Sequence, residues 1–128
     1  MFYYHTNYNI NKLYPALIFI HGSYTSSITW LKQIDNLSKI NKNISMYAFD
    51  IIGAGMSTNV ELEYNEHLLV NKYMIYNFIE DNNIKEKCSE IIFVSSSYGG
   101  LLNLEYILDH PTKSIIYNAP GILPIINK

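Results

Sequence analysis

Short apolar runs alternate with longer stretches of helical periodicity, and this alternation limits the folds open to the chain. The runs predict strands at 15–20, 44–50, 90–94 and 114–117, with helices at about 26–40, 65–80 and from near 97 to just before 111. Continuous apolar runs are typical of strands buried on both faces. Alternating strands and helices predict a parallel sheet with crossover helices. We therefore expect an α/β fold: a three-layer αβα sandwich around a mostly parallel sheet of about four to five strands.

The helical patterns also predict which side chains face the sheet. An inward stripe is expected on each helix, and Thr25 or Ser26 is expected to cap the first. The predicted inward residues are Ile28, Leu31, Ile34, Leu37 and Ile40 in the first helix, Leu69, Tyr73, Tyr76 and Ile79 in the second, and Leu101, Leu104 and Leu108 in the third.

The length, composition and charge of the chain restrict the class of protein to which it can belong. Its 128 residues fit one domain, 1–128, and the 48% hydrophobic content is enough for one packed core. All nine basic residues are Lys and the net charge is -2, which disfavours nucleic-acid binding because such proteins usually carry a basic, Arg-containing surface. No apolar stretch approaches the ~18 residues of a membrane span, and no signal peptide is visible at the start.

The single cysteine, Cys88, excludes an intramolecular disulfide and a cysteine-built zinc site. We interpret it as a passive thiol in a reducing compartment, so a cytoplasmic protein is expected. No spacing in the sequence predicts a metal or an organic cofactor.

The segment 92–102 carries the chemistry. A buried strand turns directly into a helix, with Ser97 at the corner and Gly99 and Gly100 just beyond it. Such a sharp turn requires a strained backbone at the serine and small residues two positions before and after it, here Ser95 and Gly99. It projects the hydroxyl at the carboxyl edge of the sheet and aims the N–H of Tyr98 at a bound oxyanion.

These residues resemble the nucleophile elbow of the α/β-hydrolase fold family, with Ser95 in place of the first glycine of Gly-x-Ser-x-Gly. Two further motifs agree in order. His21-Gly22-Ser23 resembles the family's oxyanion loop, and the segment from Asp50 to Ser57 resembles its Asp-x-x-Gly-x-Gly-x-Ser turn. The resemblance covers roughly residues 13–121. It implies a partial domain, from the oxyanion loop through the elbow, that ends before the family's catalytic acid and histidine.

The resemblance also implies roles for individual residues. Ser97 is the expected nucleophile, and the N–H groups of Ser23 and Tyr98 are the expected oxyanion donors. The residues expected to support these motifs are His21, Gly22, Gly99, Gly100 and Asp50. Other interpretations exist: Ser97 as a plain turn serine, and Asp50 as a catalytic acid, although we interpret Asp50 as stabilising the turn. Dinucleotide binding by 53–58 would need glycine where Thr58 stands.

A general base for Ser97 is not evident. His110 follows Ser97 by 13 residues on one predicted helix, which places it about 20 Å away. Proton transfer needs ~3 Å, so His110 is excluded. His21 ends a neighbouring strand and is a better candidate by position, but in the resembled family this histidine supports the oxyanion loop. His67 and His5 are interpreted as surface residues.

Two functions therefore stay open. The first is a serine hydrolase acting on a small-molecule ester or amide, with its base and acid supplied by a continuation of the chain or by a second chain. The second is a catalytically inactive protein that keeps the hydrolase core as an interaction module. With few helices on one face, we also expect an exposed apolar patch over the last two strands, extended by 122–126, that favours self-association or a complementing chain.

Overall fold

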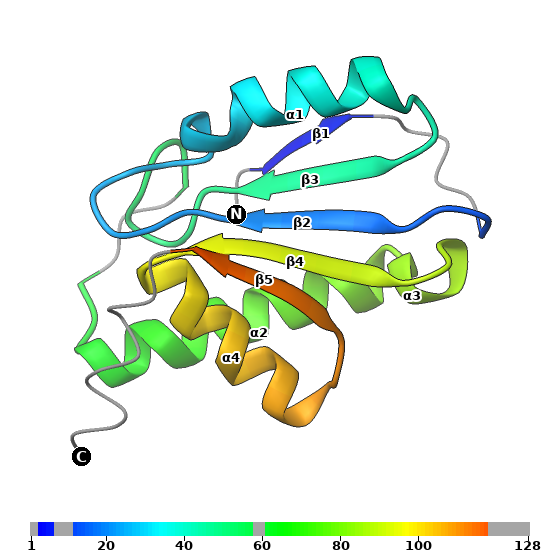
Figure 1. The fold of residues 1–128 in the computed structure, drawn as a ribbon. Coiled ribbons are helices and arrows are strands. Elements are labelled where there is room, and N and C mark those ends of the chain that lie inside the picture. Colours follow the sequence, from blue (N-terminus) through cyan, green and yellow to red (C-terminus); the bar gives the residue numbers. More distant parts are fainter. Residues whose placement is uncertain (1–2, 7–11, 58–60, 118–128) are drawn as a thin grey trace.

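The structure, a computed structural model, describes residues 3–6, 12–57 and 61–117. It contains a five-stranded sheet in the order β1-β3-β2-β4-β5 (Figure 1). Strands β2 to β5 pair in parallel, and only β1 pairs antiparallel, at the edge beside β3. The expected three-layer sandwich with a mostly parallel sheet is confirmed.

The elements lie close to their predicted positions. The strands are β1 (Tyr3–Thr6), β2 (Ala16–Ile20), β3 (Ser45–Phe49), β4 (Ile91–Ser96) and β5 (Lys113–Tyr117). The helices are α1 (Ile28–Ile40), α2 (Tyr64–Asp81), α3 (Ile84–Lys87) and α4 (Tyr98–Asp109). The short helix α3 was not predicted, and the strand β1 lies outside the four predicted strand runs.

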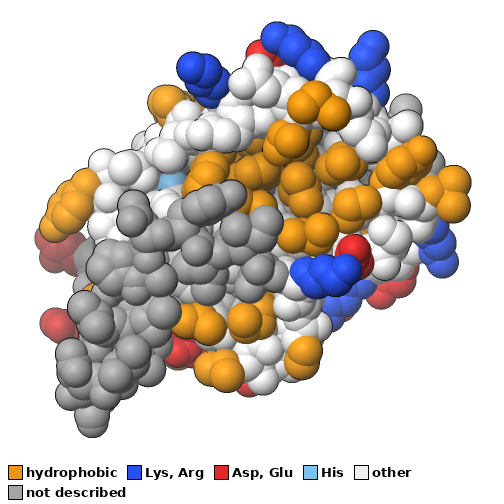
Figure 2. Space-filling view, in the orientation of Figure 1, with side chains coloured by type: hydrophobic (Ala, Val, Ile, Leu, Met, Phe, Trp, Pro, Cys, Tyr) orange, Lys and Arg blue, Asp and Glu red, His pale blue; other side chains and the backbone are white. Residues whose placement is uncertain are grey.

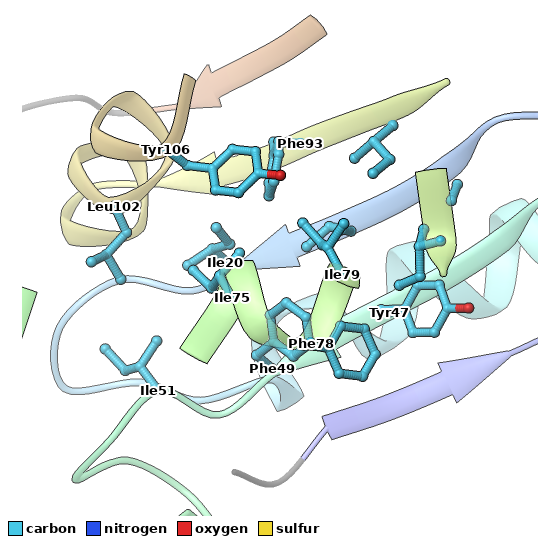
Figure 3. Close-up of a cluster of buried hydrophobic side chains, with 14 of the residues drawn as sticks. Ile20, Tyr47, Phe49, Ile51, Ile75, Phe78, Ile79, Phe93, Leu102 and Tyr106 are labelled. Atoms are coloured by element: carbon cyan, nitrogen blue, oxygen red, sulfur yellow. The ribbon is translucent and has the colours of Figure 1, made fainter. Parts of the chain in front are cut away.

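Each face of the sheet has its own apolar cluster. On one face, α1 buries Trp30 and Ile34 against side chains of β2, β3 and β4. On the other, α2, α3 and α4 pack against the opposite side chains of the same strands, with Phe49 and Phe93 at the centre (Figure 3). This packing fixes the carboxyl ends of β2, β3 and β4 at one edge of the sheet, where the predicted motifs begin.

The predicted helix stripes are only partly correct. Ile34, Ile79 and Leu101 are buried as expected, but several other members of the stripes are exposed. The exposed ones are Ile28, Ile40, Leu69, Tyr73 and Leu108. On α2 the buried face is rotated from the predicted one because it includes the polar Asn71, which an apolar pattern cannot reveal.

The predicted cap of the first helix is partly correct. The N-cap residue is Ser27, and its backbone N–H donates to a carboxylate oxygen of Asp50 at 2.7 Å. The hydroxyl of Ser26 accepts from the N–H of Ile28 at 3.4 Å, whereas Thr25 donates its hydroxyl to the carbonyl oxygen of Gly22. The side chain of Asp50, 23 residues further along the chain, thus accepts a hydrogen bond from a backbone N–H group at the start of α1.

The face that carries α1 is covered over part of its width. Figure 2 shows hydrophobic side chains gathered over the middle of the sheet on this face. Leu17 of β2 and Ile92 of β4 are half-buried there. The part of the predicted patch at 122–126 lies outside the described residues. Among the helices described, none has the length and apolar character needed to cross a membrane.

Candidate active site

Ser97 occupies the strained corner expected between β4 and α4. Its backbone has φ 50° and ψ -120°, in the region that residues with a Cβ rarely adopt. Such a conformation costs on the order of 1–3 kcal/mol and persists only where surrounding structure enforces it. The helix starts immediately afterwards, and the N–H of Gly100 donates to the carbonyl oxygen of Ser97 at 2.9 Å.

Two glycines let the elbow approach β2 closely. A Cβ at Gly99 would lie 2.4 Å from the carbonyl oxygen of Ile20 and 2.5 Å from that of His21, so no side chain fits there. A Cβ at Gly22 would lie 3.1 Å from the Cβ of Ser97. On the other side of the corner, Ser95 is fully buried, and its hydroxyl oxygen accepts a hydrogen bond from Asn103. The loop after β2 and the elbow after β4 are therefore in direct contact.

Three polar groups in these two segments have no hydrogen-bond partner among the described residues. Within the described ranges, neither the hydroxyl of Ser97 nor the N–H groups of Ser23 and Tyr98 make a hydrogen bond. Ser97 is half-buried and Ser23 is exposed, so these groups can be reached from solvent. The hydroxyl of Ser97 and the N–H groups of Ser23 and Tyr98 are therefore available to a ligand.

His21 is fully buried, and both of its ring nitrogens are occupied. The backbone N–H of Ile51 donates to Nε2 at 3.1 Å, so Nε2 carries no proton. Nδ1 must then hold the proton, which it donates to the carbonyl oxygen of Gly22 at 2.6 Å. His21 therefore joins the loop after β2 to the loop after β3, and it cannot act as a base for Ser97 in this state.

This burial predicts a pH dependence of stability. Desolvation lowers the pKa of His21 below its ordinary value, against smaller opposing effects of its bond to Gly22 and of the Asp50 carboxylate. Below about pH 6.5 the unfolded chain therefore binds a proton that the folded chain resists. The free energy of unfolding should decrease as the pH is lowered, at a slope of up to ~1.4 kcal/mol per pH unit. Urea unfolding between pH 7.5 and 5 should show this slope, and His21→Gln should show a smaller one. Equal slopes would contradict the assignment.

Asp50 stabilises the turn after β3, as interpreted from the sequence. The residue is 2% exposed, and its two carboxylate oxygens accept from the N–H groups of Ser27 at 2.7 Å and Met56 at 2.8 Å. Its carbonyl oxygen also accepts from the hydroxyl of Ser57. Gly55, with φ 50°, leaves the carboxylate room: a Cβ there would lie 2.3 Å from it. Both carboxylate oxygens therefore accept from backbone N–H groups, one within the turn and one at the start of α1.

A cavity of about 750 Å³ adjoins the elbow. Its wall is formed by the loops after β2 and β3, the start of α2 and the side chain of Tyr98. His67, which the sequence placed on the surface, is a half-buried part of this wall, with Nδ1 3.0 Å from the hydroxyl of Tyr98. The sequence held no signal for this pairing because the residues are 31 positions apart.

The remaining described histidines lie away from the elbow. His110 closes α4 and stacks on Tyr106 with ring centroids 4.8 Å apart, at the opposite end of the helix from Ser97. His5 lies in β1, at the edge of the sheet. Among residues 3–6, 12–57 and 61–117, no group of three or more His, Cys, Asp or Glu could hold a metal ion. Cys88 is buried, which raises the pKa of its thiol.

Comparison with known proteins identifies the fold. No protein-family model and no curated protein matches the chain. A solved structure of a marine microorganism esterase matches with a TM-score of 0.68 and 19% identity, covering 98% of this chain and 47% of the esterase. An epoxide hydrolase from metagenomes of hot environments matches with a TM-score of 0.74 and 22% identity, covering 92% of this chain and 38% of the epoxide hydrolase. A serine hydrolase from Cycloclasticus zankles matches with a TM-score of 0.73 and 16% identity, covering 89% of this chain and 40% of the serine hydrolase.

These proteins differ in reaction but share one architecture, so the likeness concerns the fold. The resemblance inferred from the motifs is confirmed at that level. The chain spans less than half the length of each of these three structures.

Proposed function

Because the chain has the α/β-hydrolase fold, we propose that it carries the nucleophile and oxyanion donors of a serine hydrolase that acts on carboxylic esters or small amides. Ser97 is the nucleophile, and the N–H groups of Ser23 and Tyr98 are the donors. The observation that carries this proposal is the strained conformation of Ser97, with its hydroxyl free beside the loop at Gly22.

The reaction follows from this arrangement. The Oγ of Ser97 attacks the substrate carbonyl carbon and loses its proton, while the carbonyl oxygen becomes an oxyanion that accepts from Ser23 and Tyr98. The intermediate collapses, the alcohol or amine leaves with a proton, and water then hydrolyses the acyl-serine. Preorganised donors of this kind each contribute about 10²–10³ in rate.

A base must take the serine proton, and among the described residues no histidine is hydrogen-bonded to Ser97. His21 has both nitrogens bonded and His110 lies at the far end of α4. We propose that the base and acid come from a continuation of the chain or from a complementing chain. An oxyanion hole and binding alone can sustain ~10³–10⁴-fold acceleration over water, so weak turnover by this chain is part of the proposal.

A fluorophosphonate probe tests the nucleophile directly. The full chain should be labelled, and peptide mapping should place the label on Ser97. Ser97→Ala should abolish labelling, whereas the adjacent Ser96→Ala, as a matched control, should retain it. Labelling that survives in Ser97→Ala, or a wild-type chain that does not react, would overturn the proposal.

The second candidate is a catalytically inactive interaction module, favoured by the absence of a base hydrogen-bonded to Ser97 in the described residues. Its partner would be a second copy or a complementing chain that covers the hydrophobic side chains on the α1 face. An unreactive serine together with a dimer in sedimentation equilibrium would favour it. For both candidate functions we propose that the chain works in a reducing compartment such as the cytoplasm, because Cys88 is a free, buried thiol.

A further inference from the structure

Asn71 fixes the hydrogen-bonding state of the histidine in the cavity beside the elbow. Asn71 is 1% exposed, and its Oδ1 accepts from the N–H of Ile52 at 3.0 Å. This contact assigns the amide, so Nδ2 faces His67. Nδ2 lies 2.9 Å from the carbonyl oxygen of His67 and 3.0 Å from its Nδ1. Because an amide NH₂ only donates, Nδ1 of His67 accepts and carries no proton.

Tyr98 supports the same assignment. Burial raises the pKa of Tyr98 to about 12, so its phenol keeps its proton at neutral pH. The hydroxyl lies 3.0 Å from Nδ1 of His67, so its O–H and the NH₂ of Asn71 share the single lone pair of that nitrogen. A neutral imidazole with an unprotonated Nδ1 carries its proton on Nε2.

The Nε2–H of His67 is then a donor on the cavity wall. Within the part of the chain that the structure describes, Nε2 has no hydrogen-bond partner, and it is not among the polar atoms that are buried without one. His67 is half-buried and lines the cavity. The donor is therefore held by Asn71 and Tyr98 and remains open to a ligand.

The rest of the wall indicates which acceptor fits. Among the described residues that line it, none is Lys, Asp or Glu, and Ile51, Ile52 and Leu62 give it apolar surface. A carboxylate would lose its hydration here with no cation to compensate, whereas a neutral oxygen needs only one donor. An uncharged, largely apolar ligand with one oxygen acceptor matches this surface.

We propose that the Nε2–H of His67 binds a neutral oxygen acceptor, a ketone or ether oxygen, on the substrate at a point away from the bond that breaks. His67 is in this view a specificity-determining residue. The inference rests on the proposed function in calling the ligand a substrate, but the hydrogen bond itself does not involve Ser97.

Three matched aryl esters test the acceptor. Methyl 4-acetylbenzoate carries a ketone, methyl 4-isopropylbenzoate has the same shape without the acceptor, and monomethyl terephthalate carries a carboxylate. Dissociation constants are measured on the Ser97→Ala full chain, which cannot turn the ligands over. We expect the acetyl ester to bind about fivefold more tightly than the isopropyl ester, as expected for one neutral hydrogen bond, and more tightly than the carboxylate.

Two variants assign this preference to His67. His67→Phe keeps a ring on the wall but removes the donor, so the ratio between the acetyl and isopropyl esters should fall to about one. His67→Gln restores an N–H donor and should recover part of the preference. Both ratios compare two ligands on one protein, so a general loss of stability does not change them.

Nitrogen NMR of the histidine-labelled chain gives an independent test of the tautomer. His67 should show a protonated Nε2 and an unprotonated Nδ1, and the acetyl ester should shift the Nε2 resonance. A proton on Nδ1, equal affinity for the acetyl and isopropyl esters, preference for the carboxylate, or a preference that survives in His67→Phe would each overturn the inference. An unreactive Ser97 with the acetyl preference intact would overturn only the proposed hydrolase function.

Discussion

Gly99→Ala is expected to lower the free energy of unfolding by about 3 kcal/mol, the upper end of the usual cost of overpacking a filled site. The added Cβ would meet the carbonyl oxygens of Ile20 and His21 at 2.4 and 2.5 Å and the carbonyl carbon of Ile20 at 2.8 Å. These are backbone atoms of β2 and its loop, so they cannot rotate aside as the end of a flexible side chain can. To relieve the contact, α4 must move away from β2.

The same movement separates the proposed oxyanion donors, since Ser23 follows β2 and Tyr98 begins α4. Fluorophosphonate labelling of Gly99→Ala should therefore drop further than its loss of folded protein explains. Urea unfolding, followed through the single Trp30, measures the stability. Trp30 is a suitable reporter because it is 6% exposed, in the cluster on the α1 face.

Gly22→Ala is the matched control for this prediction. Its Cβ would meet the Cβ of Ser97 at 3.1 Å and the carbonyl oxygen of Ser96 at 3.3 Å, contacts that a shift of a few tenths of an ångström relieves. We expect a cost of about 1 kcal/mol there. A Gly99→Ala protein as stable as the wild type, or less affected than Gly22→Ala, would show that the helix and strand are not in close contact at the elbow.

The sequence predicts the parts of this molecule that depend on local pattern. Strand and helix alternation places the elements because each depends on a run of neighbouring residues. The corner at Ser97 is predictable for the same reason: strand, small residues and helix follow one another directly. Even the error at Leu69 and Tyr73 has a local cause, since tyrosine and leucine at helical spacing also occur on the exposed side of α2.

What the sequence does not predict depends on pairs of residues far apart along the chain. The cavity histidine, His67, is defined by Asn71, by the N–H of Ile52 and by Tyr98. Asn71 is only four positions from His67, but the N–H of Ile52 and the side chain of Tyr98 do not follow from the pattern around residue 67. A buried polar network is chosen by the three-dimensional arrangement that satisfies every donor and acceptor, and a single sequence shows only the members.

Asp50 belongs to the turn after β3 but also binds the start of α1, which lies far from it in the sequence. Asp50→Asn is therefore expected to lower the free energy of unfolding by about 3 kcal/mol. One carboxylate oxygen accepts from Met56 within the turn, and the other accepts from Ser27 at the start of α1. An amide of the same shape has one acceptor and one donor. It therefore keeps one of these bonds and points an N–H group at the other buried N–H.

The expected loss combines a charge-assisted hydrogen bond, about 1.5–3 kcal/mol, with a buried donor left facing a donor. Asp35→Asn is the control, because Asp35 lies on the exposed side of α1 and pairs with Lys39 at 3.0 Å. Surface pairs of this kind contribute roughly 0–1 kcal/mol. Urea unfolding at pH 7.5 compares the two variants with the wild type.

Both variants remove one negative charge. A difference between them therefore reports the loss of the hydrogen bonds of Asp50 and not the change in net charge. If Asp50→Asn and Asp35→Asn cost the same, the carboxylate at position 50 does not hold the turn to the helix start. If Asp50→Asn alone is costly, α1 depends on a side chain at the end of β3. The loop at 51–55, which lines the cavity, is then joined to the start of the first helix, and the shape of the cavity depends on the carboxylate of Asp50.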